Sequence, residues 1–291
     1  MNRFDPRLNA IRADLADIAL KGQVDVARFV RGETLQVAAP QAPVRREPSH
    51  GAMLLTEALH GEQVKVFEES EGGWAWVQLT KDRYVGWVPR DALAESGPKA
   101  THKVAALRTF AFARPDIKAP PLSVLPLGAR VALTATTEDN NATYGLIEPA
   151  GAVVVQHLAS VDAYEADWVS VAERFMRTPY LWGGKTSGGI DCSGLVQVAL
   201  HAGGLPAPRD SDMQEAELGA LLPQTHGLPP LRRGDLVFWK GHVGIMLDAG
   251  TLLHANAYHM EVAAEPLRAA MDRLSTRGTE VTSVRRIGPR D

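Results

Sequence analysis

The chain is poor in cysteine: Cys192 is the only one among its 291 residues. A lone cysteine excludes an intrachain disulfide framework and any metal site built from several cysteines. Free cysteine is among the most buried residue types, so a structural role in the core is the simplest interpretation of such a residue. A chemical role for Cys192 therefore has to be argued from its neighbours.

The sequence also lacks an excess of charge and a long apolar run. Its 31 Lys and Arg are balanced by 34 Asp and Glu, which provides no basic surface for nucleic acid or an anionic membrane. No run of about 18 apolar residues occurs, and the N-terminal residues lack the layout of a signal peptide. We therefore expect a cytoplasmic protein without nucleic-acid or membrane partners. The oligomeric state stays open.

A chain of this length suggests two or three domains. Residues 8–20 have the apolar spacing of a short helix. Alternating apolar residues and glycine-containing turns over residues 41–94 predict a small β-barrel. Residues 127–133 repeat residues 60–66 at an offset of 67, which predicts a second barrel. The expected division is an N-terminal extension (1–38), two barrels (39–97 and 98–160) and a further domain (161–291).

The two barrels differ in their aromatic residues. The second copy lacks counterparts of Trp74, Trp76 and Trp87, so we expect a repeated fold without a repeated ligand site. Both units resemble bacterial SH3 (SH3b) domains. The elements Gly-Glu-Gln-Val, Gly-Trp-Ala-Trp-Val and Tyr-Val-Gly-Trp-Val of the first unit support this resemblance.

From residue 161 the pattern changes to helices followed by strands. Apolar spacing predicts helices over 164–176, over 191–200 and after residue 211, with Gly203-Gly204 as a stop signal. Residues 235–239, 242–247 and 251–257 then read as consecutive antiparallel strands. This order indicates an α+β domain.

Cys192 lies in the first turn of the second expected helix, after a glycine-rich loop. Unpaired backbone N–H groups and the helix dipole at this position favour a thiolate and lower its pKa. The same N–H groups are suited to hold an oxyanion. This position favours a nucleophile over a structural cysteine.

His242 and His254 are candidates for the base and for the group that orients it. A two-residue loop between their strands places the two imidazoles on opposite faces of the sheet. A three-residue loop, Asp248-Ala249-Gly250 with Gly250 left-handed, pairs residue 242 with residue 256 and places both rings on one face. A Cys-His-His relay requires the second register.

Five motifs follow one another in this region: Pro-Tyr-Leu-Trp-Gly-Gly, Asp-Cys-Ser-Gly-Leu-Val, Gly-Asp-Leu-Val-Phe-Trp, Gly-His-Val-Gly-Ile and Leu-His-Ala. Over residues 161–265 the chain thus resembles the NlpC/P60 cell-wall peptidases, which are circularly permuted papain-like enzymes. With the SH3b pair it resembles γ-D-glutamyl-L-diamino acid endopeptidases of murein-peptide recycling. The resemblance implies an α+β fold with a papain-like catalytic domain preceded by two small SH3b barrels.

The resemblance also implies roles for individual residues. Cys192 is the nucleophile, His242 the general base, and His254 the group that orients the base. The implied substrate-binding residues of the catalytic domain are Tyr180, which also donates to the oxyanion, Asp191 and Ser193 beside the nucleophile, and Arg209, Asp210 and Ser211. A structural alternative stays open for the last segment, since Ser211-x-x-Gln214 is also a capping box.

In similar full-length enzymes the first SH3b domain closes the groove and selects a free amino group. Tyr84 matches the tyrosine of this site. Glu57 is the candidate acid, with Glu47 as another candidate and a solvated surface role as the alternative for both.

Two further patterns resemble cofactor sites, but neither fits one. Gly184-Lys185-Thr186 lacks the earlier glycine and the strand of a phosphate-binding loop. His254 and His259 are expected on opposite faces of a strand, which excludes a shared metal. We expect neither a metal nor another cofactor.

These observations predict a cysteine endopeptidase that cuts the γ-D-glutamyl–diamino acid bond of murein peptides with a free N-terminal L-Ala, in peptidoglycan recycling. The alternatives are a muramoyl-alanine amidase, an acyl-transfer enzyme of related fold, and a non-catalytic SH3b protein that binds wall peptides. The sequence leaves open which diamino acid is accepted and whether intact wall is cut.

Overall fold

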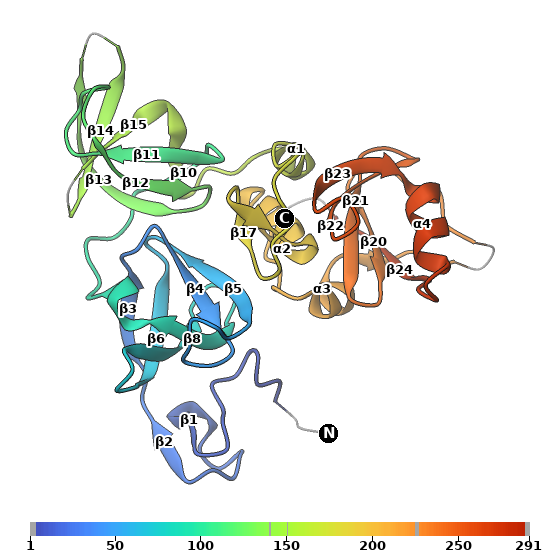
Figure 1. The fold of residues 1–291 in the computed structure, drawn as a ribbon, viewed down its shortest axis with the longest axis horizontal. Coiled ribbons are helices and arrows are strands. Elements are labelled where there is room, and N and C mark those ends of the chain that lie inside the picture. The colour runs from blue at the N-terminus through green and yellow to red at the C-terminus, as the bar shows by residue number, and fades with distance from the viewer. Residues whose placement is uncertain (1–3, 140, 150, 225–226, 289–291) are drawn as a thin grey trace. The chain divides into compact units, whose positions relative to one another are not determined.

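The structure, a computed structural model, describes residues 4–139, 141–149, 151–224 and 227–288. The chain divides into two compact units, Met1–Ala163 and Tyr164–Asp291 (Figure 1). The first unit consists of strands and single 3-10 turns, and the second combines helices with a sheet. No helix within the described ranges is long and apolar enough to span a membrane.

The first barrel is a seven-stranded sheet with the order β5-β4-β8-β7-β6-β3-β9. Its strands are β3 (Glu33–Val37), β4 (Gln41–Arg45), β5 (Leu54–Leu59), β6 (Gln63–Glu69), β7 (Trp74–Leu79), β8 (Val85–Pro89) and β9 (Leu93–Ala94), with the 3-10 turn η2 (Arg90–Ala92) before β9. Because β3 pairs with both β6 and β9, the barrel includes residues before position 39 that the sequence assigned to the N-terminal extension.

The helix predicted over residues 8–20 is wrong. This segment contains a short strand, β1 (Leu15–Asp17), which pairs with β2 (Arg28–Val30), and the 3-10 turn η1 (Ile18–Leu20). Its apolar side chains are buried against the aromatic residues of the first barrel, in one cluster of Ala10, Leu15, Phe67, Trp74, Trp76, Val85 and Trp87. The apolar spacing therefore reflects packing against the surface of the barrel and does not reflect a helix.

Polar contacts hold the same segment on the barrel. The guanidinium of Arg12 lies 4.5 Å from the ring centroid of Trp76 and forms an ion pair of 2.6 Å with Glu68. The backbone N–H of Val85 donates to the carbonyl oxygen of Arg7 at 2.8 Å. The N-terminal extension is thus packed against the first barrel.

The second barrel repeats the first. Its strands are β10 (His102–Val104), β11 (Arg108–Phe112), β12 (Pro121–Pro126), β13 (Arg130–Glu138), β14 (Thr143–Glu148), β15 (Ala152–Val154) and β16 (Leu158–Ser160), with η3 (Val155–His157) before β16. The order β12-β11-β15-β14-β13-β10-β16 is that of the first barrel with every strand number raised by seven. Gly61 and Gly128, 67 residues apart, have φ of +78° and +88°, a conformation that favours glycine. The predicted repeat is confirmed.

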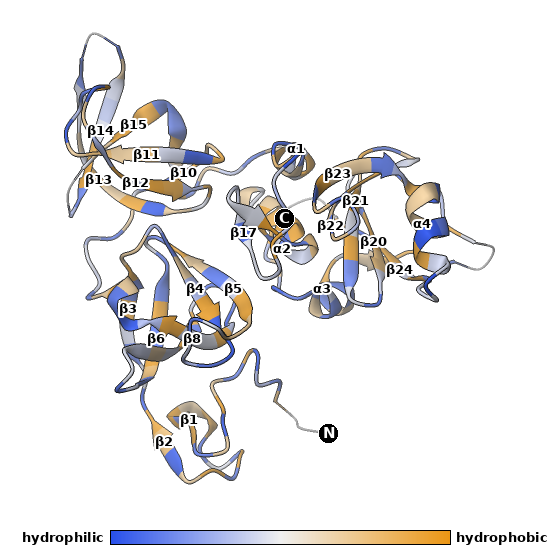
Figure 2. Cartoon of the chain, in the orientation of Figure 1, coloured by the Kyte–Doolittle hydropathy of each residue, from blue (hydrophilic) through white to orange (hydrophobic). Residues whose placement is uncertain are grey.

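The described residues of the second unit form the helices α1 (Trp168–Glu173), α2 (Cys192–Ala202), α3 (Ser211–Glu217) and α4 (Leu267–Ser275). The predicted second and third helices correspond to α2 and α3. The first is shorter than predicted, because Asp167 caps α1 by accepting from the N–H of Val169 at 3.0 Å. In Figure 2 α2 is hydrophobic along most of its length, and its residues from Cys192 to Leu200 are buried.

The sheet of the second unit is antiparallel, with the order β19-β24-β20-β21-β22-β23. Its strands are β19 (Ala220–Leu221), β20 (Asp235–Trp239), β21 (His242–Met246), β22 (Thr251–Asn256), β23 (Glu261–Pro266) and β24 (Val281–Arg286). The three predicted strands are β20, β21 and β22. A small hairpin, β17 (Lys185–Thr186) and β18 (Gly189–Ile190), precedes α2, whose residues contact β21 and β22. The fold thus combines an α+β unit with an SH3-like β-rich region.

Candidate active site

Cys192 is the first residue of α2, as the sequence predicted. Asp191 caps the helix by accepting from the N–H of Gly194 at 2.7 Å. Gly194 has to be a glycine, because a Cβ there would lie 2.4 Å from the carbonyl oxygen of Gly184. This close approach of the glycine-rich loop fixes the first turn of α2, and with it the position of the buried Cys192 thiol.

His242 and His254 lie on one face of the sheet, in the register that a relay requires. Ile245 pairs with Leu253 and Met246 with Leu252. The rings are joined by a hydrogen bond of 2.9 Å between Nε2 of His242 and Nδ1 of His254. The predicted register is therefore confirmed.

One detail of the predicted loop is wrong: Gly250 is not left-handed, since its φ is outside the positive range. The side chain of Asp248 shapes the loop instead. Its Oδ1 accepts from the backbone N–H groups of Gly250 and Thr251, both at 2.8 Å. This pattern is an Asx turn, which closes the loop without a left-handed residue.

The thiol and the histidine pair meet where α2 contacts β21. The backbone N–H of Val243, next to His242, hydrogen-bonds to Cys192. Because Nε2 of His242 is bonded to His254, Nδ1 is the ring nitrogen available to take the proton of the thiol. The three residues are thus ordered for nucleophilic catalysis by a thiol.

Burial keeps these groups neutral in the resting state. Burial and the charge of Asp191 raise the pKa of Cys192 to about 12. Their effect is larger than that of the backbone N–H groups, which favour the thiolate. Burial likewise lowers the pKa of His242 to about 3 and that of His254 to about 4. The thiolate of lowered pKa expected from the helix start is therefore wrong for this state. Thiolate formation requires proton transfer to His242 as the nucleophile attacks.

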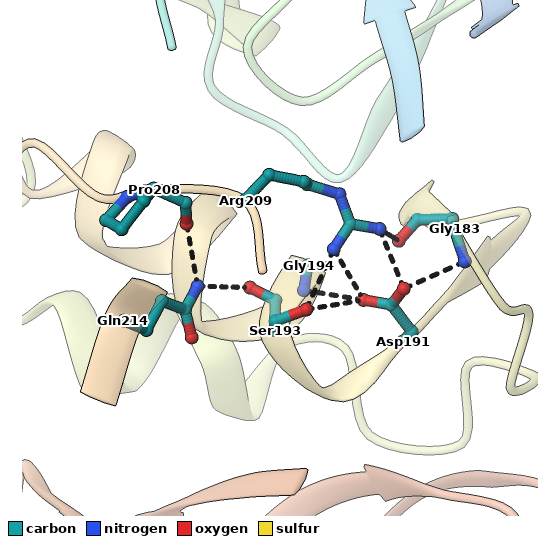
Figure 3. A network of polar contacts seen from close by, with 8 residues as sticks. Gly183, Asp191, Ser193, Gly194, Pro208, Arg209 and Gln214 are labelled. Atoms are coloured by element: carbon teal, nitrogen blue, oxygen red, sulfur yellow. Dashed lines mark hydrogen bonds and ion pairs between the residues drawn. The ribbon is translucent and has the colours of Figure 1, made fainter. Parts of the chain in front are cut away.

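Asp191, Ser193 and Arg209 form one buried network (Figure 3). The guanidinium of Arg209 binds the carboxylate of Asp191 through two hydrogen bonds of 2.9 and 2.7 Å. It also donates to the hydroxyl of Ser193 at 2.9 Å. Arg209 is only 1% exposed, so its charge is used inside the protein to fix the residues on either side of Cys192.

The capping box considered for residues 211–214 is wrong. Asp210 is the residue before α3, and Ser211 is already helical; both are partly buried. The amide of Gln214 donates instead to the carbonyl oxygens of Ser193 and Pro208, both at 2.9 Å (Figure 3). The segment therefore braces the first turn of α2.

We predict that Arg209→Met destabilises the protein by about 3–5 kcal/mol, because the carboxylate of Asp191 is then left buried without its cation. Urea unfolding measures this loss. Arg233→Met is the matched control: Arg233 pairs with Asp167 and Glu173 at the surface, where such pairs contribute about 0–1 kcal/mol. Similar losses in the two variants would contradict the scaffold role of Arg209.

Tyr180 belongs to the same site. Its backbone N–H donates to the carbonyl oxygen of Met260 at 2.8 Å, which anchors the residue before the glycine-rich loop. Burial raises the pKa of its phenol, and the nearby Cys192 and Asp191 add to this rise. The hydroxyl is therefore protonated at neutral pH, near the thiol, and able to donate to an oxyanion.

The two candidates from the first barrel are both buried. Tyr84 is 3% exposed and lies in the core cluster of that barrel. Glu57, on β5, is 5% exposed, so the solvated surface role considered for it is wrong. Glu47 is exposed. All three belong to the first unit.

Two residues of the site were missed by the sequence reasoning. Nε2 of His254 hydrogen-bonds to Oε1 of Glu265 at 2.9 Å, and Arg273 binds the same carboxylate through Oε2 at 2.8 Å. Glu265 lies on β23 and Arg273 on α4. No local motif marked either residue, because the contacts arise only when β23 pairs with β22 and α4 folds back.

The reason given against a shared metal at His254 and His259 is also wrong. Strand β22 ends at Asn256, and the following turn brings the two rings to a centroid distance of 6.4 Å. Ligand atoms of His254, His259 and Glu265 lie within 4.8 Å of one another. However, both ring nitrogens of His254 are already hydrogen-bonded, and Arg273 already balances the charge of Glu265. We assign this cluster to hydrogen bonding.

Comparisons with known proteins agree with this site. Residues 177–278 match the NlpC/P60 family, and residues 44–93 match the bacterial dipeptidyl-peptidase Sh3 domain. Dipeptidyl-peptidase 6 of Lysinibacillus sphaericus is 28% identical over 250 residues, which are 79% of this chain and 90% of that protein. The gamma-D-glutamyl-L-lysine dipeptidyl-peptidase of Bacillus subtilis is 30% identical over 229 residues, 70% of this chain and 72% of that protein.

A solved structure shows the same fold. An NlpC/P60 family protein from Bacillus cereus has a TM-score of 0.72 at 20% sequence identity, over 88% of this chain and all of that one. The relatives are matched over most of their length, and the Cys-His-His geometry agrees with the family. The chain belongs to the NlpC/P60 family and is a cysteine peptidase with an SH3-like N-terminal region.

Proposed function

We propose that this peptidase cuts the amide bond between γ-D-glutamate and a diamino acid in murein peptides with a free N-terminal L-Ala, and that it acts in the cytoplasm in peptidoglycan recycling. The main support is the hydrogen-bonded pair of His242 and His254 beside the Cys192 thiol. The choice of bond is supported by relatives from two Bacillus species that are named gamma-D-glutamyl-L-lysine dipeptidyl-peptidase.

The proposed mechanism follows from the order of the groups. Nδ1 of His242 takes the proton of Cys192 while the sulfur attacks the carbonyl carbon of the γ-D-glutamyl group. Backbone N–H groups at the start of α2 and the hydroxyl of Tyr180 stabilise the tetrahedral oxyanion. The protonated His242 then gives its proton to the leaving amine, and water hydrolyses the acyl-enzyme.

The first barrel is proposed to select the free amino group through Tyr84 and Glu57. A buried carboxylate attracts an ammonium group more strongly than an exposed one, because the local dielectric constant is low. Dipeptidyl-peptidases release a dipeptide from a chain end, so the naming of the relatives agrees with recognition of that end. In the catalytic unit, Asp191, Ser193 and Arg209 contribute by shaping the groove next to Cys192.

Mass spectrometry of the products from L-Ala-γ-D-Glu-diaminopimelate tests the proposed bond. We expect the dipeptide L-Ala-γ-D-Glu and free diaminopimelate; the same peptide with L-lysine identifies the preferred diamino acid. A muramoyl peptide offered in parallel tests the amidase alternative. Release of an intact peptide from its muramoyl group, with no cut after D-glutamate, would contradict the proposal.

We further predict that acetylating the N-terminal amine of the peptide lowers kcat/KM at least about 100-fold. The acetyl group removes the charge and adds bulk, and a 100-fold change corresponds to about 2.7 kcal/mol. Tyr84→Phe and Glu57→Gln should each reduce this discrimination, with Glu47→Gln as the control at an exposed glutamate. Equal cleavage of both peptides, or of intact sacculi, would favour a wall hydrolase without selection of the amine.

A further inference from the structure

The chain of hydrogen bonds at the active site does not end at His254. His242 Nε2 contacts His254 Nδ1 at 2.9 Å, and His254 Nε2 contacts Glu265 Oε1 at 2.9 Å. Arg273 binds the other carboxylate oxygen at 2.8 Å and also donates to Oε1 at 2.5 Å. His254 is 1% exposed, and the side chain of Glu265 is 10% exposed. Three side chains thus extend in series from the base, from the buried His254 to Arg273, whose side chain is 19% exposed.

The direction of each hydrogen bond follows from the last acceptor. An ionised carboxylate only accepts, and a neutral imidazole donates from one nitrogen and accepts at the other. His254 must therefore donate from Nε2 to Glu265 and accept at Nδ1. His242 must then donate from its own Nε2, which leaves an unprotonated Nδ1 as the acceptor for the thiol proton.

The surroundings of Glu265 keep it an acceptor. Burial raises the pKa of its carboxyl, but the hydrogen bonds from Arg273 and His254 outweigh burial, so the net shift is downward. Arg273 in turn lies over the ring of Tyr258, with its guanidinium carbon 4.1 Å from the centroid. His259 is the other titratable group beside His254. The carboxylate thus accepts from Arg273 at both oxygens and from His254 at one of them.

We propose that Glu265, held by Arg273, is a positioning residue that sets the tautomers of His254 and His242 and so makes Nδ1 of His242 the base for Cys192. The proposal rests on the peptidase function proposed above. A purely structural role of Glu265 would require only that the hydrogen bonds are present. The proposed role also requires that each bond has the stated donor and acceptor. The wrong tautomer of a catalytic histidine costs about 10⁴-fold in the serine protease triad.

Glu265→Gln removes the obligate acceptor while preserving the size of the side chain. Arg273 can only donate and reaches both carboxylate oxygens, so the amide NH₂ group faces a donor of Arg273 in either orientation. When the NH₂ group lies toward His254, His254 must accept at Nε2, which forces both histidines into the opposite tautomer. We expect kcat to fall at least about 100-fold with little change in KM. Glu261→Gln is the matched control on β23, since Glu261 pairs with the exposed Arg177.

Removing the cation as well provides the discriminating variant. In Glu265→Gln combined with Arg273→Met, the amide can turn its oxygen toward His254 and restore the original tautomers. We expect kcat to recover at least about tenfold relative to Glu265→Gln, whereas a structural role predicts a further loss, because two contacts are then missing. A double variant no more active than Glu265→Gln, or Glu265→Gln as active as Glu261→Gln, would overturn the proposal.

A measurement on the unmodified protein needs neither the Glu265 and Arg273 variants nor a substrate. Two-dimensional ¹⁵N NMR of the imidazole rings, assigned with His254→Gln and His242→Gln, should show both rings protonated at Nε2 at neutral pH. An Nδ1-protonated His254 would overturn the proposal regardless of which peptide is cut. If the tautomers are as expected but no murein peptide is cleaved, the proposed substrate fails and the positioning role stands.

Discussion

Cys192→Ala is expected to abolish peptide hydrolysis while leaving peptide binding largely intact. The thiol at the start of α2, beside His242, is the proposed nucleophile, and losing the nucleophile of a catalytic triad lowers kcat by about 10⁶-fold. The substitution removes one sulfur atom from a buried position and leaves the cap by Asp191 unchanged. Turnover is measured by release of the amine product, and binding by calorimetry with the uncleaved peptide.

The sequence provides an internal control for this experiment. Because the chain has one cysteine, iodoacetamide adds mass at Cys192 alone, and the labelled fraction should equal the fraction of activity lost. His102→Gln, in the second barrel, is a variant expected to retain full turnover. Residual hydrolysis by Cys192→Ala above the level of a contaminant would show that another group is the nucleophile.

His242→Ala is expected to be nearly as severe, with a loss of kcat of about 10⁴-fold or more, because no other group can then take the thiol proton. His254→Gln should be milder. It keeps a polar side chain beside Nε2 of His242 but breaks the path to Glu265. We expect kcat to fall by about 10- to 100-fold with KM nearly unchanged, as for a group that acts through the base.

Steady-state kinetics on the same peptide distinguish these cases. A rise in KM with an unchanged kcat for His254→Gln would show that His254 contacts the substrate. Equal losses in His242→Ala and His254→Gln would mean that either histidine is able to serve as the base. Both outcomes contradict the assigned order from Cys192 to His242 to His254.

Much of the fold was predictable because its signals are local. The cap at Asp191, the apolar stripe that follows and the stop at Gly203-Gly204 define α2 within one short, continuous segment. The repeat at an offset of 67 predicted the second barrel, and its strand order repeats that of the first. The helix predicted over residues 8–20 failed because its apolar residues contact Trp74, Trp76 and Trp87 of the first barrel, and periodicity cannot reveal such distant partners.

The motifs were enough to predict Cys192 as the nucleophile with His242 and His254 as its partners, because each of these residues lies in a contiguous motif at a helix start or in a strand. The sequence left two registers for the loop between β21 and β22, of which only the three-residue loop places both histidines on one face, because side chains alternate along a strand. Contacts between residues of different motifs could be seen only in the folded protein. Arg209 became a buried partner of Asp191, and Glu265 with Arg273 completed the relay, because hydrogen bonds between separate elements depend on how the chain folds back in space.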